Sequence, residues 1–323
     1  IPIEETLAAA ELLISKGLIR EREGSGGAVW EFTHLKLREC VYDSIPAARR
    51  RELHRRAAAA LNKRYLPQHW DPALSAMLSH HYAKAGERVL ELKQYLRELI
   101  FDITLNHDLF PMLSDRLFLS CSIPFSSREE TDKKVEHAIS ILDELRGSEA
   151  LTEREYAQLE ASCFELAGGY RISWGEYTGA KLYTDEAIHI SKQYGFTETH
   201  IHCLKHYAYM YLQIEEADKL IKVSRELLRL AKEAPAPHYF ATAVRFIGMG
   251  YMMRGNYAAA EKIFLHSVKL FEQMQLTGRR YTLGMLVAKC YLGEIYERTG
   301  DLERAAAQLS ECTRQCEAMN LYW

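Results

Sequence analysis

The chain has 323 residues, of which 48% are hydrophobic and 26% charged, and its formal net charge at pH 7 is -3. This length suits two compact domains or one extended repeat array. The small net charge excludes a broad electrostatic field for nucleic acid, and one solvated helix explains the local basic run over residues 49–56. The longest apolar runs are far below the roughly 18–20 residues of a membrane-spanning helix. We therefore expect a cytoplasmic protein with no membrane contact and no direct nucleic-acid contact.

The cysteine pattern also suits the cytosol. Seven cysteines are scattered along the sequence, at Cys40, Cys121, Cys163, Cys203, Cys290, Cys312 and Cys316. Their odd number and irregular spacing favour reduced thiols over a disulfide framework. Cys312 and Cys316 fall on one helical face, but no histidine lies near them in sequence, so a buried apolar role is favoured over a metal site. We expect no metal ion.

The first 45 residues predict a helix followed by a β-hairpin. Apolar residues at helical spacing mark a helix over residues 4–17, and residues 19–23 and 28–33 are typical of strands around a glycine-rich turn. A helix followed by such a hairpin is typical of the end of a winged-helix domain. The chain opens on Ile1 rather than methionine and is helix-like at once, so we expect it to be a piece of a longer protein.

Helical sequence fills most of the remaining chain. It resumes at His34, pauses at Pro46 and continues over residues 47–65, before Pro67 and Pro72 mark a break. From about residue 73 onward the sequence predicts helices and short turns.

A pattern of small and aromatic residues repeats in the second half of the chain. Gly248, Tyr251, Gly255, Tyr257, Ala260 and Phe264 recur 45 residues later as Gly293, Tyr296, Gly300, Leu302, Ala305 and Leu309. An earlier copy starts at Gly168, and a degenerate copy between them predicts helices over residues 198–213 and 216–232. Small residues let the two helices of a hairpin approach closely, and aromatics fill the gap to the next hairpin. These are the marks of a tetratricopeptide repeat.

The predicted fold class is therefore all-α. A tetratricopeptide-like superhelix of helical hairpins is expected over residues 87–323, after linker helices over residues 46–86. Residues 1–45 are expected to be the C-terminal part of a winged-helix domain, with its β-hairpin.

The stretch after the predicted hairpin carries a family resemblance. Residues 32–46 (FTHLKLRECVYDSIP) and 48–56 (ARRRELHRR) resemble a segment found just after the ATPase core in STAND-class signalling ATPases. The likeness is greatest to large LuxR-type regulators related to the maltose-operon activator, and to cyclases and kinases that carry the same ATPase module. The likeness is specific over about residues 11–61. It implies a parent protein with a nucleotide-binding domain, a winged helix and a superhelical repeat sensor, of which this chain is the last two parts.

The resemblance also implies cofactors and partners. The parent would use ATP or ADP with magnesium. Its upstream ATPase domain would be a partner of this chain, and activation would involve self-association. This chain has no G-x-x-x-x-G-K-[ST] loop, so we expect it to be non-catalytic and to hold no cofactor itself. It also lacks the DNA-binding helix-turn-helix that LuxR-type members carry at their end, which leaves the parent's output domain open.

His34 is the candidate nucleotide-sensing residue. It matches the family's winged-helix histidine, which contacts the diphosphate of bound ADP, and an imidazole can donate a hydrogen bond to a phosphate oxygen. This role requires the ATPase domain. The alternative is a histidine that caps the helix after the hairpin.

Ten residues are candidates for a ligand-binding groove. In tetratricopeptide arrays the first helix of each hairpin lines the concave groove through its second, fifth, ninth and twelfth positions. Counted back from the turns at Glu215, Gly255 and Gly300, these positions are His202, Lys205, Tyr209, Thr242, Arg245, Met249, Met252, Cys290, Glu294 and Glu297. The cations could hold an acidic group, the tyrosine could stack on a flat surface, and the methionines adapt to irregular shapes. The alternative is that they are solvated side chains facing another domain of the parent.

A second hypothesis concerns His202 and His206, which lie four residues apart on a predicted helix and could present two ligands to zinc. No third ligand is evident in the sequence, so ordinary polar roles are favoured.

These patterns predict a sensor and autoinhibitory repeat module of a STAND-type ATPase, and we expect the parent to be a transcriptional regulator. A small-molecule inducer or a protein effector would bind in the groove and shift the parent between a closed ADP form and an assembling ATP form. The alternative is a plain tetratricopeptide scaffold for protein–protein interaction. An enzyme is the least favoured class, because the sequence has no nucleophile elbow and no dinucleotide-binding fingerprint after a strand.

Overall fold

The computed structural model describes residues 3–24, 27–64, 72–106, 114–115, 126–278 and 280–319. Within these ranges every regular element is a helix, except for the two strands of one sheet, which confirms the all-α class. No helix in these ranges combines the length and the hydropathy of a membrane span. The chain divides into two compact units, one of Ile1–Leu66 with His80–Glu87 and one of Pro67–Ser79 with Arg88–Trp323.

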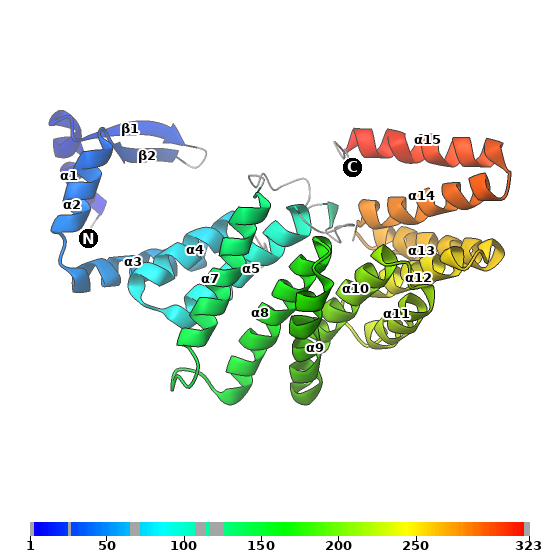
Figure 1. Cartoon of the computed structure of the whole chain (residues 1–323). Helices are drawn as coiled ribbons and strands as arrows, with labels where there is room; N and C mark the ends of the chain where they lie inside the picture. The colour runs from blue at the N-terminus through cyan, green and yellow to red at the C-terminus, as the bar shows by residue number, and fades with distance from the viewer. Residues whose placement is uncertain are drawn as a thin grey trace. The chain divides into compact units, whose positions relative to one another are not determined.

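The first unit contains the predicted helix and hairpin. Its elements are α1 (Ile3–Ser15), β1 (Ile19–Gly24), β2 (Gly27–Phe32), α2 (Leu35–Ser44) and α3 (Ala47–Arg64). The strands pair antiparallel, with Ile19 opposite Phe32. The Thr33 hydroxyl donates to the Gly17 carbonyl at 2.8 Å and so ties the end of the hairpin to the turn after α1. Figure 1 shows this helix and hairpin in blue.

The structure divides the stretch of residues 46–86, expected to be a linker, between the two units. The helix α3 belongs to the first unit, and the boundary falls inside α4 (Pro72–Ala85). Asn62 of α3 donates to the Tyr82 hydroxyl of α4 at 2.6 Å. The end of α4 therefore packs on α3.

Three histidines and a tyrosine meet between α2, α3 and α4 of the first unit. The Nδ1 atoms of His54 and His81 are 2.8 Å apart, and the Tyr42 hydroxyl lies 2.9 Å from His54 Nε2. The ring of His80 stands edge-on to that of His81, with centroids 5.6 Å apart. Burial lowers the pKa of His54, and His81, His80 and Lys84 lower it further. Burial and His80 likewise lower the pKa of His81.

We expect this unit to lose stability on acidification. The ordinary pKa of histidine is 6.5, and both folded-state values lie below it. At a pH between the lowered folded-state pKa and 6.5, the unfolded chain binds more protons than the folded chain. The free energy of unfolding therefore falls as the pH drops below about 6.5. Calorimetric melting from about pH 7.5 to about pH 5 measures this loss. The His54→Gln variant should lose less melting temperature over that range than the wild type, and an equal loss would contradict the assignment.

The second unit is a series of helices packed in pairs. After α4 they follow as α5 (Arg88–Asn106), α7 (Arg128–Glu144), α8 (Glu153–Ser173), α9 (Tyr177–Tyr194), α10 (Thr197–Gln213), α11 (Ala217–Ala231), α12 (Pro237–Met253), α13 (Tyr257–Leu276), α14 (Thr282–Arg298) and α15 (Leu302–Ala318). The last eight form four consecutive helical hairpins, coloured green to red in Figure 1. The two helices predicted for the degenerate copy are α10 and α11. The repeat array is therefore confirmed.

The turn inside each of these hairpins has the same backbone pattern. One residue has positive φ, at 75° for Gly175, 57° for Glu215, 72° for Gly255 and 85° for Gly300. In each turn this residue's N–H donates to the carbonyl three residues before it, and the next N–H donates to the carbonyl five residues before. This is the Schellman ending of a helix, which favours glycine because an L side chain is crowded at positive φ.

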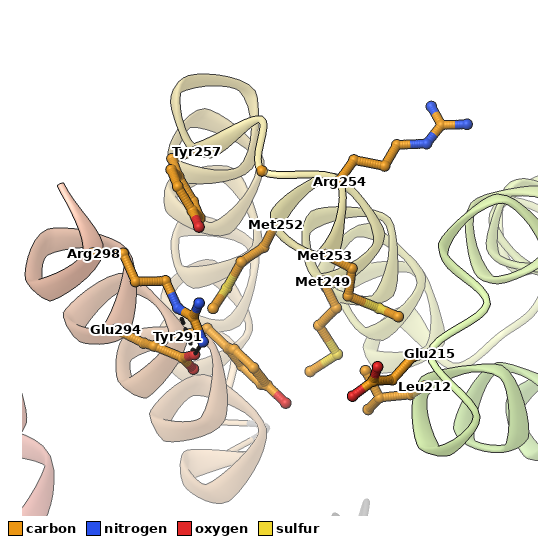
Figure 2. Close-up of a pocket in the computed structure, with 11 residues that line it drawn as sticks. Leu212, Glu215, Met249, Met252, Met253, Arg254, Tyr257, Tyr291, Glu294 and Arg298 are labelled. Atoms are coloured by element: carbon orange, nitrogen blue, oxygen red, sulfur yellow. Dashed lines mark hydrogen bonds and ion pairs between the residues drawn. The ribbon is translucent and has the colours of Figure 1, made fainter.

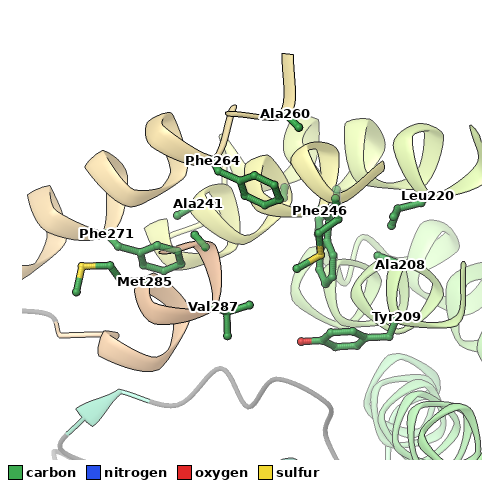
Figure 3. Packing of buried hydrophobic residues seen from close by; sticks show 14 of the residues in the cluster. Ala208, Tyr209, Leu220, Ala241, Phe246, Ala260, Phe264, Phe271, Met285 and Val287 are labelled. Atoms are coloured by element: carbon green, nitrogen blue, oxygen red, sulfur yellow. The ribbon is translucent and has the colours of Figure 1, made fainter. Parts of the chain in front are cut away.

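Glycine also permits the two helices of a hairpin to approach closely. A Cβ at Gly248 would lie 3.0–3.1 Å from the Phe264 ring, and a Cβ at Gly293 would lie 2.7 Å from Leu309. Figure 3 shows Phe264 in the core between α12 and α13, near Phe246. Gly248 and Gly293 therefore each face the partner helix of their hairpin, as predicted.

Candidate functional site

The predicted groove residues lie on α10, α12 and α14, the first helices of three consecutive hairpins. The helix α8 contacts α10, α10 contacts α12, and α12 contacts α14. These four helices form one continuous layer, which we call the first-helix layer. The repeat register therefore places the candidates on neighbouring elements.

A buried carboxylate joins two histidines in this layer. Glu165 of α8 is 5% exposed, and its Oε1 lies 2.6 Å from His206 Nε2 and 3.7 Å from His202 Nδ1. His202 Nε2 in turn lies 2.5 Å from the Tyr239 hydroxyl of α12. We call these four residues the Glu165 cluster. One chain of polar contacts thus links α8, α10 and α12.

Burial sets the protonation of the Glu165 cluster. Desolvation raises the pKa of Glu165, while His202 and Lys205 act to lower it. Desolvation also lowers the pKa of His202 to about 4, against the raising effect of Glu165. His202 is therefore neutral near pH 7, with one ring nitrogen to donate and one to accept. Gly169 leaves room for the cluster, because a Cβ there would lie 2.3–2.7 Å from the His206 ring.

The pair proposed from sequence as zinc ligands thus hydrogen-bonds within the chain. His206 contacts Glu165, and His202 contacts Tyr239. Among the residues that the structure describes, no group of three or more His, Cys, Asp and Glu side chains is arranged to hold a metal ion.

Four predicted groove residues are buried in the first-helix layer. Their exposed fractions are 9% for Lys205, 3% for Tyr209, 1% for Thr242 and 0% for Arg245. The Arg245 guanidinium donates to the Gly284 carbonyl at 3.1 Å, which links α12 to α14. The Tyr209 ring meets Phe246 edge-on, with centroids 5.1 Å apart, and so links α10 to α12. These four side chains are therefore buried rather than freely solvated, and Tyr209 and Arg245 each contact the next hairpin.

A cavity of about 660 Å³ lies at the C-terminal ends of α10, α12 and α14. Three predicted groove residues line it, namely Met249, Met252 and Glu294. Its other lining residues are Leu212, Glu215, Met253, Arg254, Gly255, Tyr257, Tyr291 and Arg298 (Figure 2). This volume suits a small ligand or a few residues of a peptide.

The charges around the cavity are not equally available. Glu294 accepts from Arg298 at 2.7 and 3.0 Å. Arg254 donates from Nε to Asp218 at 2.6 Å, and Figure 2 shows its guanidinium extending away from the other lining residues. The Glu215 carboxylate points into the cavity in the same view, and its side chain has no ion-pair or hydrogen-bond partner among the described residues. The cavity therefore presents methionine side chains and one unpaired carboxylate.

Two other predicted groove residues lie on α14 outside the described cavity lining. Cys290 faces Cys312 of α15, and its proximity lowers the pKa of the Cys312 thiol. Glu297 is exposed. The register therefore places the ten residues on three neighbouring helices, and three of the ten line the cavity.

His34 lies in the first unit, at the N-cap position of α2. Its backbone is extended, with φ -134° and ψ 131°, and its side chain makes no capping hydrogen bond. The imidazole is exposed. His34 thus occupies the capping position, but its side chain does not stabilise the helix through a capping hydrogen bond.

Glu165, Tyr239, Glu215 and Tyr291 were missed as site residues in the sequence. Glu165 stands among small and apolar residues of α8, and a charged residue on such a face is a signal of an internal partner. Glu215 stands where three other turns carry glycine. That exception is visible when the repeats are aligned.

Comparisons with known proteins support the fold. No protein-family model matches the sequence, and no curated protein matches it. A STAND protein with a tetratricopeptide repeat sensor from Pyrococcus horikoshii matches 95% of this chain, with a TM-score of 0.57 and 15% identity. This chain spans 45% of that protein.

Two further solved structures have the same architecture. A Rap protein complexed with competence and sporulation factor matches 87% of this chain and 75% of its own, with a TM-score of 0.52 and 14% identity. The apo form of RapI matches 84% of this chain and 77% of its own, with a TM-score of 0.51 and 11% identity. At these identities the likeness shows the fold, a tetratricopeptide-like helical repeat.

Proposed function

We propose that this chain is the non-catalytic sensor part of a STAND-type signalling ATPase, and that a regulatory ligand binds in the cavity at the ends of α10, α12 and α14. The observation that carries this proposal is the cavity itself. It is formed by three consecutive hairpins, so an occupant that contacts all three changes the preferred spacing of the hairpins. A ligand with such differential affinity shifts a conformational equilibrium.

The proposal extends to the parent protein. Residues 32–56 resemble the segment after a STAND ATPase core, and a STAND protein with a repeat sensor has the same fold over 95% of this chain. The helix and hairpin of the first unit would then be the end of a winged helix. His34 would contact the ADP diphosphate held by the upstream ATPase domain, with magnesium supplied there. The parent would act in the cytoplasm as a transcriptional regulator and would self-associate when ATP replaces ADP.

Parentage has a direct test. A P-loop encoded immediately upstream of this segment in the full gene supports a STAND parent. A gene that encodes these repeats alone overturns that part of the proposal and leaves a tetratricopeptide interaction scaffold.

Ligand binding is tested by thermal shift with peptide and metabolite libraries. A compound that binds only the folded chain raises its stability by about 2.7 kcal/mol at a hundred times Kd. The Met252→Asp variant should lose the shift, because it places a charge on the apolar lining of the cavity. The matched control is Leu182→Asp on α9, where the side chain is 73% exposed and away from the cavity lining. Equal shifts in both variants would place the ligand elsewhere.

A further inference from the structure

Glu215 occupies a strained backbone position. The corresponding residue in the other three hairpin turns is Gly175, Gly255 or Gly300, and all four turns share one hydrogen-bond pattern. Glu215 is the single non-glycine residue with positive φ in the part of the chain that the structure describes. Its Cβ crowds the backbone there, a cost that glycine avoids. Glycine would therefore make the better turn.

Contacts of the Glu215 side chain do not compensate this strain. Asparagine and aspartate tolerate positive φ because their short side chains hydrogen-bond locally. The longer Glu215 side chain is exposed, and no described residue pairs with it. Strained backbone residues of this kind concentrate at functional sites. The structure thus offers no stabilising reason for a glutamate here.

The surroundings of Glu215 define what its carboxylate can bind. Figure 2 shows the carboxylate facing the Tyr291 hydroxyl across the cavity, with Met249 and Met253 above the gap and Leu212 beside Glu215. The Glu294 carboxylate, the other acidic group of the lining, is paired with an arginine. The complementary ligand therefore has one cationic group next to apolar surface.

We infer that Glu215 sets the specificity of the cavity, and that the ligand is a peptide segment with an arginine or lysine flanked by apolar residues. This inference rests on the proposed function, because it names the ligand class of the same cavity. An arginine or lysine stem can lie along the methionines while its charged head meets the carboxylate. A volume of about 660 Å³ leaves room for the flanking residues.

The test uses fluorescein-labelled pentapeptide libraries and the full chain. Four positions carry mixed apolar residues, and the central position is fixed as arginine, as its neutral isostere citrulline, or as glutamate. Fluorescence anisotropy with wild-type protein should give about tenfold tighter binding of the arginine set than of the citrulline set, the size expected for one charge-assisted hydrogen bond. The preference should shrink as salt is added.

Three variants separate charge from strain. Glu215→Gln keeps the backbone strain and should abolish the preference for arginine over citrulline. Glu215→Gly should abolish it as well and also raise Tm by roughly 1–3 °C, because the strain is relieved. The control Glu297→Gln removes an exposed carboxylate of α14 that is not among the described cavity lining residues, and it should change neither property.

The outcomes distinguish this inference from the proposed function. If peptides bind the wild type without preferring arginine, or if Glu215→Gln keeps the preference, the role of Glu215 is overturned while the cavity remains a ligand site. If no peptide library binds the wild type, the peptide inference is overturned, while the proposed ligand site is still decided by the thermal-shift screen with metabolites. A lower Tm for Glu215→Gly would show that the glutamate stabilises the turn. It would contradict the inference that glutamate is kept at this strained position for ligand binding.

Discussion

Replacement of Gly168 by leucine should lower the free energy of unfolding by about 3 kcal/mol. A Cβ at this position of α8 would lie 2.3 Å from the Thr184 hydroxyl, and 3.2 Å from both the Ala180 carbonyl oxygen and the Thr184 amide nitrogen of α9. Side chains can rotate away from an added atom, but backbone atoms of a packed helix cannot. The two helices must therefore separate, and the buried residues between them lose contact.

The urea midpoint of the full chain measures this effect, and two other glycines serve as controls. Gly293→Ala should cost less than Gly168→Ala, because its Cβ meets only the Leu309 side chain. Gly179→Ala should raise stability by up to about 1 kcal/mol, because alanine favours the helix and only Arg171 side-chain atoms lie within contact, at 3.6 Å or more. A wild-type midpoint for Gly168→Leu would show that α8 and α9 are not packed as described.

Replacement of Glu165 by leucine should cost about 3–5 kcal/mol, because it breaks a buried polar network from one side. The substitution leaves His206 without the acceptor that lies 2.6 Å away, and it removes the carboxylate near His202. Unpaired polar groups in such a site lose hydration without gaining a partner.

The Glu165→Gln variant is the comparison for Glu165→Leu, because its amide oxygen can still accept a hydrogen bond from His206. It should cost clearly less than leucine. The surface control Glu186→Leu on α9, where the side chain is exposed, should stay within about 0.5 kcal/mol of the wild type. If Glu165→Leu is as stable as the glutamine variant, the cluster does not contribute to stability through its hydrogen bonds.

The repeat fold could be predicted from the sequence because the spacing of small residues indicates where two helices pack closely. Gly248 and Gly293 recur at one interval, and each faces the partner helix of its own hairpin. The strands of the first unit and the helices α10 and α11 likewise follow from local patterns of apolar residues and glycine. These patterns are local in the sequence, so they can be recognised without knowledge of the tertiary structure.

The site was only partly accessible, for a physical reason. Register fixes the side of a helix on which a residue lies, but not how tightly the next hairpin covers it. Lys205 and Arg245 were therefore expected in a groove, whereas the structure buries both side chains. Met249, Met252 and Glu294 meet at the cavity because they lie near the helix ends, where the hairpins leave space. The positive φ of Glu215 depends on the turn, and only comparison with the glycine of the other repeats exposes it.

The measurement that tests ligand binding in the cavity most directly is amide hydrogen exchange with and without the tightest-binding arginine pentapeptide. We expect slower exchange at the C-terminal ends of α10, α12 and α14 and in the turn that contains Glu215, with no change in α9 or in the first unit. Protection confined to other helices, or exchange that is the same with and without the bound peptide, would contradict a ligand site at this cavity.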